Sequence, residues 1–457
     1  MGTVTADQKV NEIVGRIERL PLTAYQIRAR LIVGIATFFD AFDIVTMSFA
    51  LPSLIGAWHL KPQQIGLLLS ASFIGQLIGA IFFGRLAERF GRLRTTVLTV
   101  LVFSIFSFCC AAAWNYMALL AFRLLQGIGL GGEVPVAASY INEIAKAKGR
   151  GKFVLLYELV FPIGLMIGSL AGFWIVPLFG WRWLFIIGGV PALAALYLRI
   201  ALPESPRWLA SKGHIDRAEK AMTKIEDGVR RALGTTELPE VKIAAVATAG
   251  GHTTRFSELF RGIYLRRTLF IWFVWFALNL SNHGIGGWLP SLYRSVFKLS
   301  VSDSLGLSLL STFAGLLGSI AVALMIDRIG RRRWLAMSAT IGGCLFAVVW
   351  LTGASRVVYV AAFASIANFF FFSNTLALYL YTPELYPTRM RTLGLGMSSA
   401  VMRVASMSAP FITGMVVAQG ALSSAFLLYG GAAVAGGIMI ALFGIETKGR
   451  VLEEISP

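Results

Sequence analysis

The sequence predicts an all-α membrane protein in which twelve transmembrane helices form two pseudo-symmetric six-helix halves. Of its 457 residues, 56% are apolar and only 14% are charged, whereas soluble domains carry about 25% charged residues. Apolar stretches of ~20 residues, the length that crosses a bilayer, recur from one end of the chain to the other. These observations exclude a water-soluble globule. Motifs that occur in both halves, described below, predict the pseudo-symmetry.

The apolar stretches define the predicted spans. We expect helices near residues 31–56, 65–86, 95–113, 115–139, 153–177, 182–201, 267–290, 305–326, 334–353, 357–381, 392–417 and 422–445. One long polar insertion separates the first six spans from the last six. The predicted organisation is an N-terminal amphipathic segment (1–30), a six-helix bundle (31–201), a linker with short helices (202–266), a second six-helix bundle (267–445) and a tail (446–457).

The distribution of basic residues predicts the orientation. Fourteen Lys and Arg residues fall in short loops on the side of the termini, against five on the opposite side. Cytoplasmic loops carry such an excess, so we expect a multi-pass protein of the bacterial inner membrane with both termini in the cytoplasm. The same asymmetry accounts for much of the net charge of +18, and no nucleic-acid partner is needed to explain it.

The first 30 residues carry Lys and Arg but no early apolar core and no small-residue cleavage site, so we expect no cleaved signal peptide. Apolar residues then repeat at helical spacing, which predicts an amphipathic helix on the cytoplasmic membrane surface. They are Val10, Ile13, Val14, Ile17 and Leu20.

Three charged motifs occur twice at nearly the same separation. Glu88 after the second span corresponds to Asp327 after the eighth, Glu143 with Arg150 to Glu384 with Arg391, and Glu204 to Glu446, at offsets of 239 to 242 residues. Such repetition predicts a duplicated six-helix unit whose copies face each other and enclose a site at the membrane midplane.

These loops resemble the major facilitator superfamily over residues 31–454. The resemblance rests on the loops Gly84 to Arg94 and Asp327 to Arg333, on Arg123 to Gly129 in the fourth span, and on Pro203 to Trp208 and Pro383 to Arg391. The last two motifs are similar to those of the branch that contains sugar porters, organic-ion transporters and synaptic-vesicle-like proteins. The resemblance implies secondary transport by alternating access, usually by a monomer.

Within that branch, Phe39 to Asp43, Gly131 to Ala137, and Arg403 resemble the aromatic-acid/proton symporters and the bacterial nicotinate (niacin) transporters. The finer resemblance implies proton-coupled uptake of a small aromatic monocarboxylate, with the arginine that matches Arg403 receiving the carboxylate. It implies no cofactor beyond the proton as coupling ion.

Ionisable residues at bilayer depth need a partner, a cavity or a function. Arg403, near the centre of the eleventh span, is permanently charged and has no acidic neighbour in its own span, so we expect it to bind an organic anion. The alternative is a buried pair with an acid of the N-terminal half.

Four acids are candidates for carrying the proton, since burial favours the neutral carboxyl group. Asp40 and Asp43 rank above Glu133 and Glu158, which lie nearer the cytoplasmic ends of their helices. Arg123 is expected to pair with an acid of the same half or to act as a structural clamp.

Polar and aromatic residues near the middle of the spans are expected to line the cavity. They are Asn279, Asn282, His283, Trp288, Asn368, Asn374, Tyr379, Gln126, Tyr157 and Phe39. Hydrogen bonding between helices is the alternative role for the amides, and a structural histidine is the alternative for His283. The glycines between Gly127 and Gly132 lie in mid-membrane without a following Lys, so close helix packing is expected there and not a nucleotide loop.

Acidic and basic residues at the cytoplasmic helix ends could form a latch of weak ion pairs when the halves close on that side. The pairs are Glu88 with Arg92, Glu143 with Arg150, Glu204 with Arg207, Asp327 with Arg331 and Glu384 with Arg391. The alternative is that these charges only enforce topology.

Cys109, Cys110 and Cys344 show no pairing or metal spacing and are expected to pack. We find no metal cluster and no nucleophile constellation, so we do not expect an enzyme. The alternatives to an organic-acid transporter are a sugar/proton symporter, an organic-cation carrier and a nutrient sensor that signals through residues 203–266.

Overall fold

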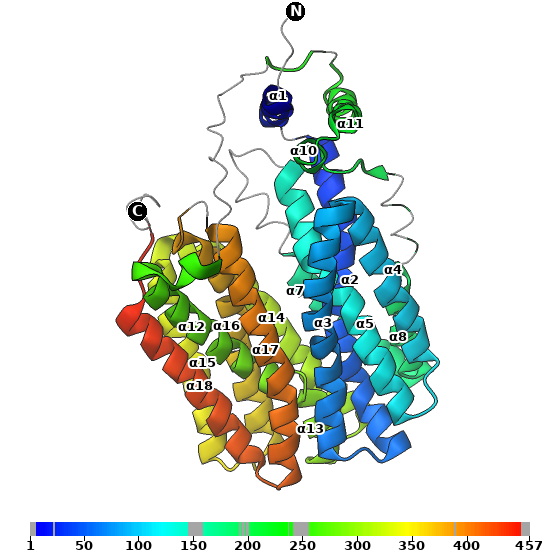
Figure 1. Ribbon diagram of the computed structural model, residues 1–457. Helices are drawn as coiled ribbons and strands as arrows, with labels where there is room; N and C mark the ends of the chain where they lie inside the picture. Colours follow the sequence, from blue (N-terminus) through cyan, green and yellow to red (C-terminus); the bar gives the residue numbers. More distant parts are fainter. Residues whose placement is uncertain are drawn as a thin grey trace, which may run out of the picture.

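The computed structural model describes residues 6–21, 23–144, 159–191, 193, 197, 201–235, 237–240, 256–387 and 390–448. Every regular element in these ranges is a helix. The long helices form two bundles side by side, and three shorter helices cover one end of the first bundle (Figure 1). The predicted all-α fold class is confirmed.

The first bundle, called the N half here, contains α2 (Ala24–Trp58), α3 (Pro62–Phe90), α4 (Arg92–Ala111), α5 (Tyr116–Ile144), α7 (Val160–Phe179) and α8 (Arg182–Gly189). The second, the C half, contains α12 (Gly262–Gly286), α13 (Leu289–Ser295), α14 (Val301–Ile329), α15 (Arg331–Leu351), α16 (Val357–Glu384), α17 (Arg391–Ala418) and α18 (Leu422–Phe443), preceded by the 3-10 turn η1 (Phe256–Phe260). Ten spans in the described parts are long and apolar enough to cross a membrane.

One predicted span is broken. The stretch 267–290 is helical up to Gly286 and resumes as α13 at Leu289. Pro290 lies at the start of α13, where its missing N–H costs nothing, and Gly287 caps the helix before it. Residues 153–158 and most of 192–200, within the predicted fifth and sixth spans, lie outside the described residues.

Glycines bring α3 and α5 into backbone contact. A Cβ atom built on Gly127 would lie 2.2 Å from the carbonyl oxygen of Ser72, and one on Gly131 would lie 2.0 Å from that of Gln76. No other residue allows this approach, which is the usual mode of tight packing between membrane helices. The interpretation of these glycines as packing residues is confirmed.

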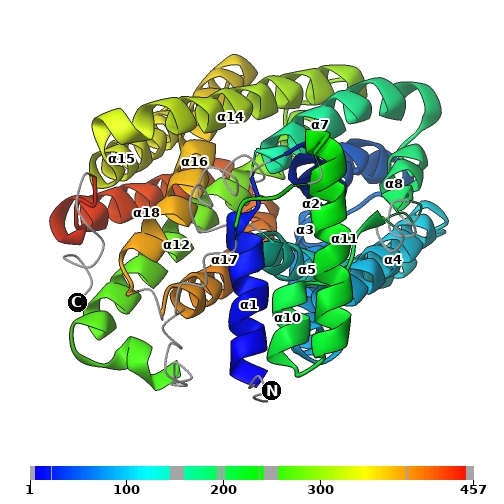
Figure 2. The same ribbon diagram turned by 90° about the horizontal axis from the view of Figure 1, so that it is seen from above.

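The apolar face of the N-terminal helix is covered by protein. α1 (Ala6–Arg19) packs with α10 (Pro206–Ser211) and α11 (Ile215–Leu233) into a small helical cap over the N half (Figures 1 and 2). Ile13 and Ile17 are buried against a cluster that includes Trp208 and Ile225. The predicted helix forms, but its expected place on the membrane surface was wrong, because its apolar face is covered by protein.

The duplicated motifs occupy equivalent structural positions. Glu204 Oε1 accepts hydrogen bonds from the backbone N–H groups of Arg92 and Leu93, at 2.9 Å each, at the start of α4. Glu446 Oε1 accepts one from the backbone N–H of Arg331, also at 2.9 Å, at the start of α15. Each glutamate therefore accepts hydrogen bonds from free N–H groups at the start of a helix. The same capping interaction occurs in both halves.

Candidate functional site

A cavity of about 190 Å³ lies between the two halves. Its walls come from α2, α3, α5 and α7 of the N half and from α12, α14, α16 and α17 of the C half. Because both halves contribute, any movement of one half against the other changes the shape of this cavity. A site with this property is what the duplicated sequence predicts.

Arg403 reaches the cavity from α17. Its side chain is buried, with 7% of the residue exposed, and Nη1 donates a hydrogen bond to Oε1 of Gln76 on α3 at 2.6 Å. No carboxylate oxygen of the described residues lies within 4.0 Å of its guanidinium nitrogens. The guanidinium is thus held in place by a neutral amide, and its charge is not cancelled by a close ion pair.

Asp40 and Asp43 face different surroundings. Asp43 accepts hydrogen bonds from Arg123 Nη1 at 2.7 and 2.8 Å and from Gln126 Nε2 at 2.8 Å, and Arg123 also donates to Gln126 Oε1. Asp40 lines the cavity, and its buried Oδ1 has no hydrogen-bond partner. The charges of both Arg403 and Asp43 act on Asp40. Asp40 is therefore the acid available to the cavity, whereas Asp43 is neutralised within the N half.

The other two acids are less directly connected. Glu133 is fully buried and accepts a hydrogen bond from the Thr37 hydroxyl at 3.1 Å, and Thr37 lines the cavity. Glu133 is thus one side chain away from the cavity. Glu158 and Tyr157 lie outside the described residues.

The C half supplies the predicted polar wall. Asn279, Asn282, His283, Asn368 and Tyr379 all line the cavity. Asn279 donates to the carbonyl of Trp275 at 2.8 Å, while its buried Oδ1 accepts no hydrogen bond. Asn282 and Asn368 donate within the C half, at 3.4 Å to Thr375 and at 3.0 Å to the Ser311 hydroxyl. Asn282 and Asn368 therefore both line the cavity and join helices, whereas Asn279 lines it and bonds within α12.

Four predicted lining residues do not line the cavity. Gln126 belongs to the Asp43 network, Asn374 accepts a hydrogen bond from Ser338 in the C half, and Phe39 packs against Phe38 and Phe42. Trp288 is fully buried, and its Nε1 donates to the Pro410 carbonyl at 3.0 Å. We expected them to line the cavity because they are polar or aromatic residues near the middle of the spans, but they contact neighbouring residues of their own half instead.

Sequence reasoning missed the contribution of α3. Phe73 and Gln76 line the cavity, and the Phe73 ring meets the His283 ring edge-on at 5.2 Å between centroids. Gln76 is buried and forms the direct hydrogen bond to Arg403. The sequence does contain an indication of this role, because Gln76 is an amide within an otherwise apolar span and such a group needs a hydrogen-bond partner.

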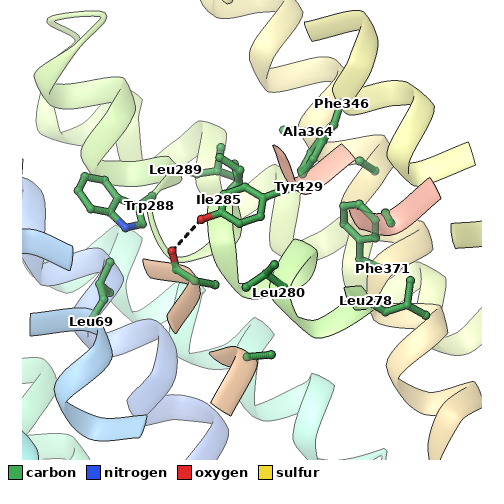
Figure 3. Packing of buried hydrophobic residues seen from close by; sticks show 14 of the residues in the cluster. Leu69, Leu278, Leu280, Ile285, Trp288, Leu289, Phe346, Ala364, Phe371 and Tyr429 are labelled. Carbon is green, nitrogen blue, oxygen red and sulfur yellow. Dashed lines mark hydrogen bonds between the residues drawn. The ribbon is translucent and has the colours of Figure 1, made fainter. Parts of the chain in front are cut away.

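The halves meet tightly on the side opposite the termini. A Cβ atom built on Gly66 of α3 would lie 2.7 Å from the carbonyl oxygen of Pro410 on α17. Trp288 lies beside Leu69 in the buried apolar cluster there (Figure 3). The bundles diverge toward the end that carries the helical cap (Figure 1). The structure is thus closed on the side away from the termini.

The ion pairs described on the termini side join residues within one half. Arg92 pairs with Glu88 at 2.8 Å and with Glu143 at 3.0 Å, and Arg331 pairs with Asp327 at 2.8 Å and with Glu384 at 3.4 Å. They fasten neighbouring helices of a bundle to one another in this conformation.

The remaining expected pairs are not formed by the described residues. Arg207 pairs with Glu18 of the cap at 2.7 Å. Glu204 instead accepts a hydrogen bond from the backbone N–H of Arg92 at the start of α4. Arg391 donates a hydrogen bond to the Tyr386 carbonyl at 3.1 Å. Glu384 forms its ion pair with Arg331 instead. Arg150 lies outside the described residues. Spacing along the chain did not reveal these partners because the acids meet residues more than 50 positions away.

Residues 33–457 match the sugar (and other) transporter family. The chain belongs to this family. The structure resembles the partially occluded inward-open xylose transporter XylE from E. coli, with a TM-score of 0.72 at 19% identity over 93% of this chain and 100% of that one. The predicted resemblance to the major facilitator superfamily is confirmed, and so is the prediction of a transporter instead of an enzyme.

Within the sugar (and other) transporter family, the chain is 35% identical to the niacin transporter NiaP of Acinetobacter baylyi over 97% of this chain and 99% of that protein. It is 30% identical to the 4-hydroxybenzoate transporter PcaK of the same organism, over 85% and 84% of the two chains. It is also 30% identical to a synaptic vesicle 2-related protein of Xenopus laevis, over 96% and 82%. The protein is a multi-pass membrane transporter of a small molecule.

Proposed function

We propose that this transporter takes up a small aromatic monocarboxylate, with nicotinate as the first candidate, together with a proton. The supporting observation is Arg403, a buried guanidinium that faces the cavity between the halves without a close carboxylate among the described residues. A planar guanidinium binds a carboxylate through two parallel hydrogen bonds. We expect the protein to act as a monomer in the bacterial inner membrane with its termini in the cytoplasm.

The size and walls of the cavity favour a single ring. An apolar cavity of about 150 Å³ holds benzene, so about 190 Å³ leaves room for one ring and a small substituent. Phe73, His283 and Tyr379 offer ring edges and faces along the walls, which suit an aromatic ligand. The printed names of two relatives, a niacin and a 4-hydroxybenzoate transporter, also describe ring compounds.

The charges around the cavity suggest how a proton is coupled. Asp43 and Arg123 cancel each other at 2.7 Å, which leaves Arg403 and Asp40 as the charges that face the cargo. When a carboxylate binds Arg403, an ionised Asp40 would make the site negative, and a net charge in a low-dielectric site is unfavourable. Protonation of Asp40 restores neutrality, so binding of the anion and of one proton would favour each other.

Transport measurements in proteoliposomes with an imposed pH gradient test this proposal. We expect accumulation of radiolabelled nicotinate, competition by benzoate and 4-hydroxybenzoate, and no competition by nicotinamide, xylose or tetraethylammonium. Nicotinate and nicotinamide differ by the charged carboxylate, so this pair tests Arg403 directly.

We expect Arg403→Gln to abolish uptake. The matched control is Arg266→Gln, which changes an exposed arginine of α12 and should leave uptake unchanged. Xylose accumulation, or equal competition by nicotinamide, would overturn the assignment of an organic acid. Wild-type uptake by Arg403→Gln would remove the anion site.

A further inference from the structure

A second cavity, of about 570 Å³, lies on the N half near the termini side. It is formed by the first turns of α2, by the second half of α11 and by residues 197, 201 and 202. The function proposed above does not involve it, and it shares no lining residue with the central cavity among the described residues.

The charged residues of this cavity are all basic. Arg28, Lys224 and Arg231 line it, and none of the described lining residues is acidic. No described carboxylate lies within 4.0 Å of the guanidinium of Arg28 or Arg231. Asp227, one turn before Arg231, is paired with Arg230 at 2.8 Å, and Arg231 Nε donates to its backbone carbonyl. The geometry therefore places two guanidinium groups around a space that lacks a counter-charge from the described residues.

The floor of the cavity is tightly packed. A Cβ atom on Gly228 would lie 2.4 Å from the ring of Tyr25, so the tyrosine ring rests directly on the backbone of α11. Arg28 also donates a hydrogen bond to the hydroxyl of Tyr197. The start of the first span and the linker helix are thus in close contact, with Arg28 contributed by α2 and Arg231 by α11.

The remaining walls are apolar, and exposed apolar side chains lie nearby. Ala29, Ile32 and Leu202 line the cavity. In the same part of the N half, Leu31 is 56% exposed and Leu193 is 70% exposed, as expected for side chains that face hydrocarbon. An amphipathic cavity with cations on the termini side and apolar walls toward the bilayer has the chemistry of a phospholipid site.

We propose that this cavity binds the phosphate group of an anionic membrane phospholipid between Arg28 and Arg231. Arginine binds phosphate oxygens through paired, charge-assisted hydrogen bonds. Acyl chains would follow the apolar walls into the bilayer. A bound lipid would bridge the first span and the helical cap, and so would stabilise the docking of the cap on the N half. This inference does not depend on the identity of the transported substrate.

Thermal unfolding of the purified full-length protein in a neutral detergent tests the proposal. The probes are short-chain phosphatidylglycerol, phosphatidylcholine of the same chain length, and sodium phosphate. We expect phosphatidylglycerol to raise the midpoint with a saturable dependence, and phosphatidylcholine to do so far less. In Arg28→Gln/Arg231→Gln the apparent affinity for phosphatidylglycerol should fall about 30-fold, because each such cation contributes about a factor of five.

The control variant, Arg217→Gln/Arg266→Gln, removes the same net charge from exposed positions outside the cavity and should bind as the wild type does. Arg28→Lys/Arg231→Lys keeps the charges and should retain most of the response even if the Gln variant folds poorly. Equal phosphatidylglycerol responses of the wild type and the Gln double variant would overturn the site. A response to sodium phosphate as strong as that to phosphatidylglycerol would overturn the lipid and assign the site to a soluble phosphate compound.

Discussion

Gln76 of α3 and Arg403 of α17 connect the two halves across the cavity, with Arg403 Nη1 donating to Gln76 Oε1 at 2.6 Å. A neutral amide orients the guanidinium without cancelling its charge, which an acid at the same position would do. The choice of glutamine at this contact therefore keeps the cation available to a carboxylate ligand.

This relationship predicts the effect of exchanging the amide for an acid. In Gln76→Glu the new carboxylate should pair with Arg403 and compete with the cargo, lowering nicotinate affinity at least about 30-fold, since a close buried charge pair couples by about 2 kcal/mol or more. Gln76→Met, which removes only a hydrogen bond, should weaken binding about tenfold or less. Binding to both variants is measured by calorimetry, and wild-type affinity in Gln76→Glu would contradict the anion site.

Asp40 should determine the pH dependence of transport. An ionised Asp40 competes with the cargo for Arg403, so lowering the pH should protonate it and strengthen nicotinate binding in the wild type. In Asp40→Asn this increase should be absent, and counterflow exchange should continue while pH-driven accumulation is lost. Vesicle uptake at several pH values tests this, with Glu133→Gln as the comparison. Acid-stimulated accumulation in Asp40→Asn but not in Glu133→Gln would assign the proton to Glu133.

The Asp43–Arg123 pair should contribute to stability more than to coupling. Both residues are buried, with 2% exposure each, so Asp43→Asn leaves an uncompensated guanidinium and should cost about 3–5 kcal/mol. The double variant Asp43→Leu/Arg123→Met removes both charges and should be less destabilised than Asp43→Leu or Arg123→Met alone, which with the wild type complete the cycle. Thermal unfolding of the four proteins checks this, and simple additivity of the single effects would contradict the pair.

Closure on the side away from the termini should depend on Gly66. The Cβ atom of a leucine there would lie 2.7 Å from the carbonyl oxygen of Pro410 and 3.2 Å from the Cα atom of Phe411, and the side chain should hold that side open. Labelling of Ser406→Cys in the cavity by a membrane-impermeant maleimide should then increase several-fold in cells. Gly56→Leu, at a glycine with no atom within 4 Å of its Cβ position, is the matched control. Equal labelling of both variants would contradict the closure.

The helical cap should loosen in acid. Burial alone would raise the pKa of Glu226, but hydrogen bonds from Arg16 and Arg19, at 2.7 and 2.8 Å, outweigh it and lower the pKa. A lowered pKa means that the ionised group stabilises docking above the ordinary carboxyl range and that this stabilisation is lost as the pH falls through the folded-state pKa. The protection factors of the α1 amides, which correct for the slower intrinsic exchange in acid, should therefore fall as the pH is lowered.

In Glu226→Gln the exchange of α1 should be fast already at neutral pH, whereas Asp216→Asn on the exposed side of α11 should leave it slow. Slow exchange in Glu226→Gln at neutral pH would show that the apolar cluster around Ile13 and Ile17 suffices to dock α1.

The sequence by itself determined the membrane solvent, the duplicated halves and the isolated central arginine. These follow from the lengths of apolar runs, from motifs repeated at a nearly constant offset, and from the rarity of charges within spans, and none of them requires knowing which helices touch. It also identified Asn279, Asn282 and His283 as residues that line the cavity, because polar residues on one face of a span need a polar environment.

Only the tertiary structure separated Asp40 from Asp43 and found Gln76. Three residues along a helix correspond to a rotation of about 300°, so the two aspartates lie on adjacent but different faces. The position of Arg123 on α5 decides which of them is neutralised. Likewise the apolar face of α1 does not reveal whether lipid or protein will cover it. Helix spacing fixes which side chains share a face, whereas the neighbour of that face is set by the packing of segments far apart in the chain.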